Sequence, residues 1–328
     1  MLAYAHHQAF VKTASERICL DGKAEKAFVS HAHFDHYRSL KKAELVLSSP
    51  ETMALLAARG KTVPERFVSS HEKDGARFSL LDAGHVLGSR MLYCENGESF
   101  LYTGDFLSEP SFLGEGAKPV QCDTLLLECT YGSPEYAFGD RFQVYDAIGK
   151  WANAELAAGR IAVIGAYALG KAQQVVSALN SAGICPVVSE DVAAVNAVYN
   201  QNGFSLEYAC NDSSALKGAF AAVLPMHKVK APLAQGLRQA YGRQVRLSVA
   251  TGWASQYAYG VDRGFVLSDH NDFEGLVGFV EACHPKKVYT THGPSERFAR
   301  ELQKRGFDAT PLESMGESQP SLASFQSA

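Results

Sequence analysis

Residues 30–36, with the sequence SHAHFDH, constrain this chain more than any other segment. They place three histidines and one aspartate within six residues, directly after the apolar run 27–29. Imidazole and carboxylate groups are ligands suited to zinc, manganese or iron. At the end of a predicted strand, the side chains of His31, His33, Asp35 and His36 can face different ways, so two ions could share the loop. One loop cannot fill two coordination shells, and the fold must therefore bring further ligands from elsewhere.

Three other residues have the chemistry and the position to complete such a site. His85 lies in a glycine-flanked turn, Asp105 follows the predicted strand 99–102, and His292 ends the predicted strand 288–291. Each alone would be an ordinary strand-end residue. Taken together they recur at strand ends, where a sheet-built site is assembled. The hypothesis requires all three to converge on residues 31–36.

The pattern of apolar residues predicts an α/β fold with two domains. The chain has 328 residues, of which 46% are hydrophobic and 20% charged, a globular composition. Short strands fill most of the first 130 residues, with a hairpin about Asn96 and Gly97. A helix is predicted over 141–156, and from about residue 160 strands and helices alternate, which implies a parallel, doubly wound sheet. Short strands return after residue 252.

Charge is unevenly distributed along the sequence. Residues 213–261 contain no acid and six basic residues, so the rest of the chain carries 25 basic against 35 acidic side chains. A basic face that includes Lys228, Lys230, Arg243 and Arg246 would suit a phosphate backbone. The alternative is a set of solvated charges scattered over several faces.

No apolar run approaches the length of about 18 residues that spans a bilayer, and the first residues lack a basic segment leading into an apolar one. Seven widely spread cysteines without a C-x-x-C pair indicate neither a disulfide framework nor a thiolate zinc site. We therefore expect a cytoplasmic protein with no membrane partner.

The motifs HAHFDH, GHVLGS, YTGDF and THG resemble those of the metallo-β-lactamase fold. LECTYG, AYALGKAQ and LSDHND resemble motifs of its nucleic-acid-cleaving branch, the β-CASP nucleases, and the chain looks most like the ligase-associated DNA exonucleases, a group also labelled mRNA 3′-end processing factors. The resemblance implies an αββα sandwich formed by residues 1–140 and 256–312, with a doubly wound β-CASP domain inserted at 141–255 and a flexible tail at 313–328.

The resemblance also implies a role for each matching residue. His31, His33 and His85 would bind one divalent ion and Asp35, His36 and His292 another, with Asp105 bridging the two; zinc is preferred, with manganese as the alternative. Asp21 would support the histidine loop. Glu128 and His270 would form a catalytic pair beside Asp35, and Ala168, Gly170 and Lys171 would bind phosphate at a helix start.

The expected function is hydrolysis of phosphodiester bonds, because two close cations both neutralise the phosphate and activate water. A DNA exonuclease acting in repair on single strands is preferred, with DNA ligase or helicase repair proteins as implied partners; an RNA-processing nuclease is the alternative. A small-molecule metallohydrolase and a non-catalytic binding subunit are the competing classes. The chain lacks the arginines that the exonuclease group carries after Gly252 and Trp253, which leaves strand contacts there open.

Overall fold

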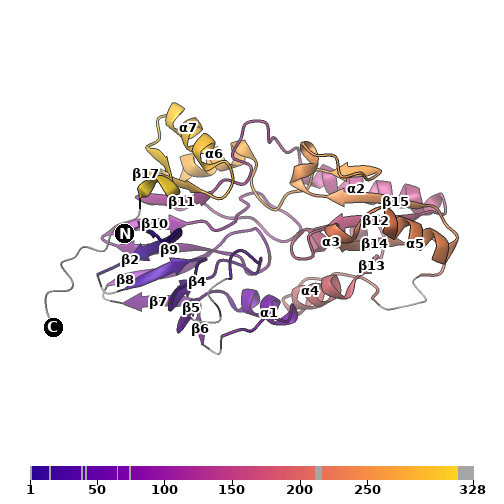
Figure 1. Cartoon of the computed structure of the whole chain (residues 1–328), viewed down its shortest axis with the longest axis horizontal. Coiled ribbons are helices and arrows are strands. Elements are labelled where there is room, and N and C mark those ends of the chain that lie inside the picture. Colours follow the sequence, from indigo (N-terminus) through magenta and orange to yellow (C-terminus); the bar gives the residue numbers. More distant parts are fainter. Residues whose placement is uncertain are drawn as a thin grey trace.

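The computed structural model describes residues 2–14, 16–37, 40, 43–64, 66–73, 75–210 and 216–316. These residues form two lobes (Figure 1). Segments from both ends of the described chain build the first lobe, and residues 141–265 build the second. Within these ranges no helix has the length and apolar character needed to cross a bilayer.

The first lobe contains two sheets. One has the strand order β1-β2-β3-β4-β5-β6, and the other β18-β17-β11-β10-β9-β8-β7. The strands of the first sheet are β1 (Leu2–Ala5), β2 (Gln8–Lys12), β3 (Arg17–Leu20), β4 (Lys26–Phe28), β5 (Leu45–Leu47) and β6 (Phe67–Val68). Those of the second are β7 (Ser70–Lys73), β8 (Ala76–Asp82), β9 (Arg90–Asn96), β10 (Glu98–Tyr102), β11 (Thr124–Glu128), β17 (Lys287–Thr291) and β18 (Ala309–Pro311). Phe28 from the first sheet and Phe78 and Phe100 from the second belong to one buried core, so the two sheets pack face to face.

Helices cover the other face of the second sheet. The helices α6 (Phe273–Cys283) and α7 (Ser295–Lys304) pack there on strand side chains such as Leu125 and Leu127. The helix α1 (Pro50–Ala58) follows β5 and contacts a helix of the second lobe, α4 (Glu190–Gln201). Short 3₁₀ helices are η1 (Met226–Lys228), η2 (Gly252–Ser255) and η3 (Leu312–Met315).

Three neighbouring parallel strands of the second sheet end at the same edge. Tyr102 of β10 lies opposite Leu126 of β11, and Glu128 of β11 lies opposite Thr291 of β17. Asp105 follows β10, Glu128 ends β11 and His292 follows β17. The strand register therefore brings residues nearly 190 positions apart to one edge of the sheet.

The second lobe is built on a parallel sheet with the strand order β13-β14-β12-β15-β16. Its strands are β12 (Ile161–Ala166), β13 (Val187–Val188), β14 (Ala221–Pro225), β15 (Val245–Ala250) and β16 (Arg263–Phe265), and its helices are α2 (Arg141–Ala157), α3 (Lys171–Ser181), α4 and α5 (Ala231–Tyr241). All six residues of β12 are buried, because alternate side chains pack into the core shared with α2, α3 and α4 and into the core shared with α5.

Several sequence predictions are confirmed. The chain is a mixed α/β protein, α2 covers the helix predicted over 141–156, β9 and β10 form the hairpin about Gly97, and the alternation after residue 160 forms a parallel sheet. The insertion was predicted to end at residue 255, yet β16 pairs with β15, so the sheet of the second lobe extends beyond that point. Of the predicted tail, residues 313–315 lie in η3 and residues 317–328 fall outside the described ranges.

Candidate metal centre

Asp21 anchors the histidine loop to the sheet behind it. Its carboxylate accepts hydrogen bonds from the Ser30 backbone N–H at 2.7 Å, from Ser30 Oγ at 2.7 Å and from Tyr102 Oη at 2.9 Å. The same carboxylate accepts a bond from His36 Nδ1 at 2.8 Å. Asp21 thereby ties Ser30 and His36, at the two ends of the histidine loop, to one carboxylate.

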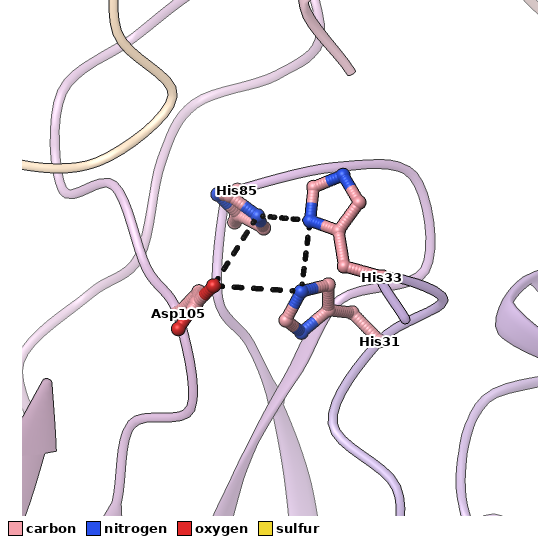
Figure 2. A group of neighbouring side chains, drawn as sticks. All are labelled: His31, His33, His85 and Asp105. Atoms are coloured by element: carbon pink, nitrogen blue, oxygen red, sulfur yellow. Dashed lines mark hydrogen bonds and ion pairs between the residues drawn. The ribbon is translucent and has the colours of Figure 1, made fainter. Parts of the chain in front are cut away.

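A first group of possible ligands gathers around a common point, formed by His31, His33, His85 and Asp105 (Figure 2). His33 Nδ1 lies 3.0 Å from His31 Nε2 and 3.1 Å from His85 Nε2. Asp105 Oδ2 lies 3.5 Å from His31 Nε2 and 3.8 Å from His85 Nε2. Ligands about 2.0 to 2.1 Å from a tetrahedral zinc ion would be separated by roughly 3.3 Å, which is close to these spacings.

The outer hydrogen bonds fix which nitrogen of each ring is unprotonated. His85 Nδ1 donates to the backbone oxygen of Asp269 at 2.8 Å, and His33 Nε2 donates to that of Leu169 at 3.2 Å. Ser30 Oγ donates its proton to Asp21, so it accepts a hydrogen bond from His31 Nδ1 at 2.9 Å. In the neutral rings the nitrogens that face the common point then carry lone pairs. Facing lone pairs about 3 Å apart repel each other, and a cation between them removes the repulsion.

A second group of donors lies on the other side of Asp105. It comprises His36, Asp105 and His292. His36 Nε2 lies 3.4 Å from Asp105 Oδ2 and 3.5 Å from Asp35 Oδ2, while His292 Nδ1 lies 3.8 Å from Asp105 Oδ1. His36 Nε2 is buried and has no hydrogen-bond partner among the described residues. An orphaned, buried imidazole nitrogen beside carboxylates suits a cation, and the residues present therefore fit the implied ions.

The residue after His292, Gly293, has no room for a side chain. His292 itself has φ 53° and Gly293 has φ +98°. A Cβ atom at Gly293 would lie 2.3 Å from the backbone oxygen of Cys129. Only glycine permits this approach, and it keeps His292 beside Asp105.

Burial and charge set the protonation of the two groups differently. Burial lowers the pKa of His33 to about 3, and it also lowers the pKa values of His31 and His85. These rings are therefore neutral, as ligands must be. Burial opposes charge on His36 and His292 too, but the Asp105 and Asp21 carboxylates together outweigh it and raise both pKa values. The His36 imidazole, whose Nε2 lies 3.5 Å from Asp35 Oδ2, lowers the pKa of Asp35 to about 2.

Glu128 and His270 form a pair beside the first group. His270 Nδ1 donates to Glu128 Oε1 at 2.9 Å, and the Thr130 backbone N–H binds Glu128 Oε2 at 2.7 Å. The His270 ring centroid lies 4.5 Å from that of His85. Burial by itself would lower the pKa of His270, but the Glu128 charge raises it to about 9. The ring therefore holds a proton at neutral pH.

In the predicted phosphate loop, residues 168–171, the polar groups form hydrogen bonds within the protein. Gln173 Oε1 accepts from the Gly170 N–H at 2.7 Å, and Gln173 Nε2 donates to the Ala168 backbone oxygen at 3.1 Å. The Lys171 ammonium forms a buried ion pair with Asp269. Sequence reasoning gave Asp269 no role, although it directly precedes His270. The Lys171–Asp269 pair joins the second lobe to the backbone that orients His85.

An open cleft of about 380 Å³ leads to these groups. It is lined by His33, Phe34, Asp35, Arg59, Asp105, Thr130, Tyr131, Tyr167, Lys171, Trp253, His270 and His292. Arg59 and Phe34 were not selected from the sequence. Phe34 could have been selected, since it stands between two candidate ligands. No motif or spacing in the sequence marks Arg59 as a cleft residue.

The other predicted basic contacts lie outside the lining of this cleft. Lys228 pairs with Asp191 at 2.8 Å, and Arg246 pairs with Asp262 at 2.8 Å. Arg243 donates to the Gly159 backbone oxygen at 2.9 Å, and Lys230 precedes α5. The structure therefore brings together the predicted metal ligands and the Glu128–His270 pair, but not these four basic residues.

The fold and the donor groups define a mixed α/β protein with a candidate centre for two metal ions. No family model matches the chain. It is 31% identical over 300 residues to a "Probable DNA ligase" of Opitutus terrae, covering 87% of this chain and 28% of that protein. It is 26% identical over 326 residues to the DNA cross-link repair 1A protein of Gallus gallus, covering 88% and 32% of the two chains. These similarities over most of the chain agree with the resemblance of its motifs to those of the metallo-β-lactamase-fold β-CASP nucleases.

Two further similarities extend this finding. The cleavage and polyadenylation specificity factor subunit 3 of Dictyostelium discoideum is 32% identical over 127 residues, which cover 35% of this chain and 15% of that protein. A crystal structure of a protein of unknown function from Enterococcus faecalis V583 has a similar fold, with a TM-score of 0.63 at 11% identity. That match covers 90% of this chain and 93% of the other. The chain thus spans less than a third of the length of each of the three curated relatives named here.

Proposed function

We propose that this protein is a metal-dependent nuclease that hydrolyses phosphodiester bonds in nucleic acid. The observation that carries the proposal is the set of imidazole lone pairs around Asp105, with the Glu128–His270 pair in the same cleft. His31, His33, His85 and Asp105 would hold one divalent ion, and Asp35, His36, His292 and Asp105 the other. Zinc is the preferred ion because imidazole nitrogens dominate the donor set, with manganese as the alternative.

Two bound cations would neutralise the phosphate charge and lower the pKa of a water molecule. The chain's own residues supply the rest. When the phosphorus–oxygen bond breaks, His270 Nε2 donates its proton to the leaving oxygen, while Glu128 holds the ring in place and stabilises its charge. General acid catalysis of this kind contributes roughly 10² to 10⁴ in rate.

The finer fold belongs to the same proposal. The two sheets with α6 and α7 correspond to the metallo-β-lactamase αββα sandwich, formed by residues 1–140 and 256–312. The second lobe corresponds to the β-CASP insertion at 141–255, extended here by β16. The cleft between them is lined from both lobes, by Asp105 and His292 on one side and Tyr167 and Trp253 on the other.

DNA is the preferred substrate, with exonucleolytic action in repair. The support is the similarity over most of the chain to a protein named as a probable DNA ligase and to a DNA cross-link repair protein. We propose DNA ligase or helicase repair proteins as partners on the same ground. The alternative is RNA processing, which the shorter similarity to an endoribonuclease, YSH1 of Candida albicans, favours.

One experiment tests the proposal and separates its branches. The protein is stripped with chelator, reloaded with Zn²⁺ or Mn²⁺, and given 5′-labelled and 3′-labelled DNA and RNA of one sequence. We expect cleavage that Asp35→Ala and His270→Asn abolish, while their matched controls Asp82→Ala and His284→Asn cleave like the parent. The label patterns reveal polarity and the choice of sugar. Absence of cleavage on every substrate, or equal cleavage by all variants, would overturn the proposal; turnover of a lactone or thioester instead would favour a small-molecule hydrolase.

A further inference from the structure

Large exposed apolar side chains concentrate around the metal cleft. In the described part of the chain these are Phe34, Phe142, Tyr167 and Tyr257, whose exposed fractions are 71%, 49%, 45% and 59%. Phe34 and Tyr167 line the cleft, and Tyr257 contacts Trp253, which also lines it, at 6.0 Å between ring centroids. Scattered single exposed aromatics need no explanation, but a group at one cleft indicates a binding surface.

The rings come from separate parts of the chain. Phe34 stands in the histidine loop between two candidate ligands, and its ring lies 5.8 Å from that of Tyr37. Tyr167 follows β12, and Trp253 lies in η2 after β15. The strands β12 and β15 are neighbours, and the chain leaves them toward opposite edges of the sheet. The crevice at the carboxyl ends of such strands is where doubly wound sheets bind ligands.

Trp253 is backed by a packed aromatic wall that leads to His270. Its ring lies 4.7 Å from that of Tyr131, and Tyr131 lies 5.9 Å from the His270 ring. Tyr131 is buried, and a Cβ atom at Gly252 would lie 2.5 Å from its hydroxyl oxygen. The wall therefore holds Trp253 in a fixed position relative to the catalytic pair.

Free positive charge is scarce in the same cleft. Apart from its histidines, Arg59 and Lys171 are the basic residues of its lining, and Lys171 is paired with Asp269 while its ammonium lies 5.0 Å from the centroid of the Tyr167 ring. Arg59 donates to the backbone oxygen of Ala32. The cleft thus offers ring faces rather than a row of phosphate-binding cations.

We propose that Phe34, Tyr167 and the Trp253–Tyr257 pair form a stacking site for unpaired nucleobases next to the bond that is cut. The inference rests on the proposed nuclease function and adds which nucleotides the site accepts. Every base has a ring face, so such stacking tolerates any sequence. In a duplex the faces are already covered by neighbouring bases, and unstacking them costs free energy. The site therefore takes single-stranded ends and disfavours paired ones.

The test measures binding without metal, so that it is independent of turnover. The full chain in chelator is titrated with a single-stranded oligonucleotide that carries 2-aminopurine, whose fluorescence is quenched by stacking. We expect quenching, with weak binding of the matching blunt duplex. Phe34→Leu and Tyr167→Leu each lower the affinity about tenfold, since they keep an apolar side chain but remove the ring face.

Phe142→Leu is the matched control, because Phe142 is similarly exposed but does not line the cleft. It should bind like the parent, and Tyr167→Phe, which keeps the ring, should restore the affinity lost in Tyr167→Leu. If Arg59 neutralises about one phosphate, a plot of the logarithm of the binding constant against the logarithm of the salt concentration should have a slope of about −0.7. Equal binding of strand and duplex, unchanged affinity in both leucine variants, or a slope steeper than about −3 would overturn the stacking site.

Failure of this inference differs from failure of the proposed function. If the metal-loaded protein cuts strand and blunt duplex equally well and the leucine variants match the parent, the nuclease assignment stands and the stacking site is wrong. If the oligonucleotide binds with quenching but no metal supports cleavage, the stacking site stands and the nuclease assignment is wrong.

Discussion

The two donor groups that share Asp105 differ in how far solvent reaches them. The side chains of His31 and His85 are 0% exposed, whereas those of Asp35 and His292 are 66% and 45% exposed. Rings in the first group pack against one another at centroid distances of 4.7 to 5.0 Å. The first group, of which only His33 and the shared Asp105 line the cleft, is therefore arranged mostly by the protein core, while the second, which adds the buried His36, is completed at the cleft by Asp35 and His292. We expect the ion in the buried group to be held more tightly and to exchange more slowly.

The change with the largest expected effect removes the residue that both groups share. Asp105→Asn keeps the shape but loses the charge, so both ions should bind at least about 100-fold more weakly. Metal analysis after dialysis against a competing chelator measures the loss. Asp82→Asn, at an exposed strand end of the same sheet, is the control. Two tightly bound ions in Asp105→Asn would contradict the view that the two donor groups share Asp105 as a ligand.

A second change separates the groups. His292→Ala removes an exposed donor of the open group and leaves the buried rings intact, so one ion should remain at parent affinity while the other weakens about 100-fold. Calorimetric titration of the metal-free protein gives both affinities. Equal weakening of both ions would show that the centre binds as one unit.

A third prediction concerns pH and the pair beside the buried group. Glu128 raises the pKa of His270 to about 9, so a proton is available on the ring below that pH and is lost above it. Glu128→Gln removes the charge and lowers the pKa of His270, and the alkaline fall in activity should move to lower pH. We expect about a tenfold loss at pH 8 and a smaller one at pH 6. Cleavage rates across pH 5 to 10 test this, and an unmoved alkaline limb would contradict the role of Glu128.

The smallest effect on stability and on binding is expected for solvent-exposed charges that already form an ion pair. Arg246→Gln breaks an exposed pair with Asp262, which contributes at most about 1 kcal/mol to stability. Arg246 lies outside the cleft lining, so oligonucleotide affinity should change less than about twofold. Arg59→Gln, inside the cleft, should weaken binding more. The reverse order would show that the basic stretch, and not the cleft, carries the nucleic acid.

Much of the fold followed from local patterns. Alternating strands and helices after residue 160 predicted the parallel sheet, because a strand such as β12 that is buried on both faces reads as a continuous apolar run. The strands expected after residue 252 were assigned to the first lobe, whereas β16 pairs with β15 and continues the sheet of the second lobe, because strand pairing is decided by the tertiary fold. Strand ends also identified the candidate ligands, because polar residues that follow buried strands stand at a sheet edge.

Other parts of the site left no local trace. Lys171 begins a helix and was predicted to meet phosphate, yet in the structure its ammonium meets Asp269, 98 positions away. Arg59 and Tyr167 reach the same cleft from different lobes. Such contacts depend on how two sheets and two lobes pack, which no window of sequence contains.

The sequence by itself determined which donors exist and which strand ends carry them, because ligand chemistry and strand period are local properties. Tertiary structure alone decided that each ring presents a lone pair to a common point. That choice depends on acceptors such as the backbone oxygens of Leu169 and Asp269, which come from distant segments. Hydrogen bonds extend only about 3 Å, so ring orientation is set by whichever groups the finished fold places within that reach.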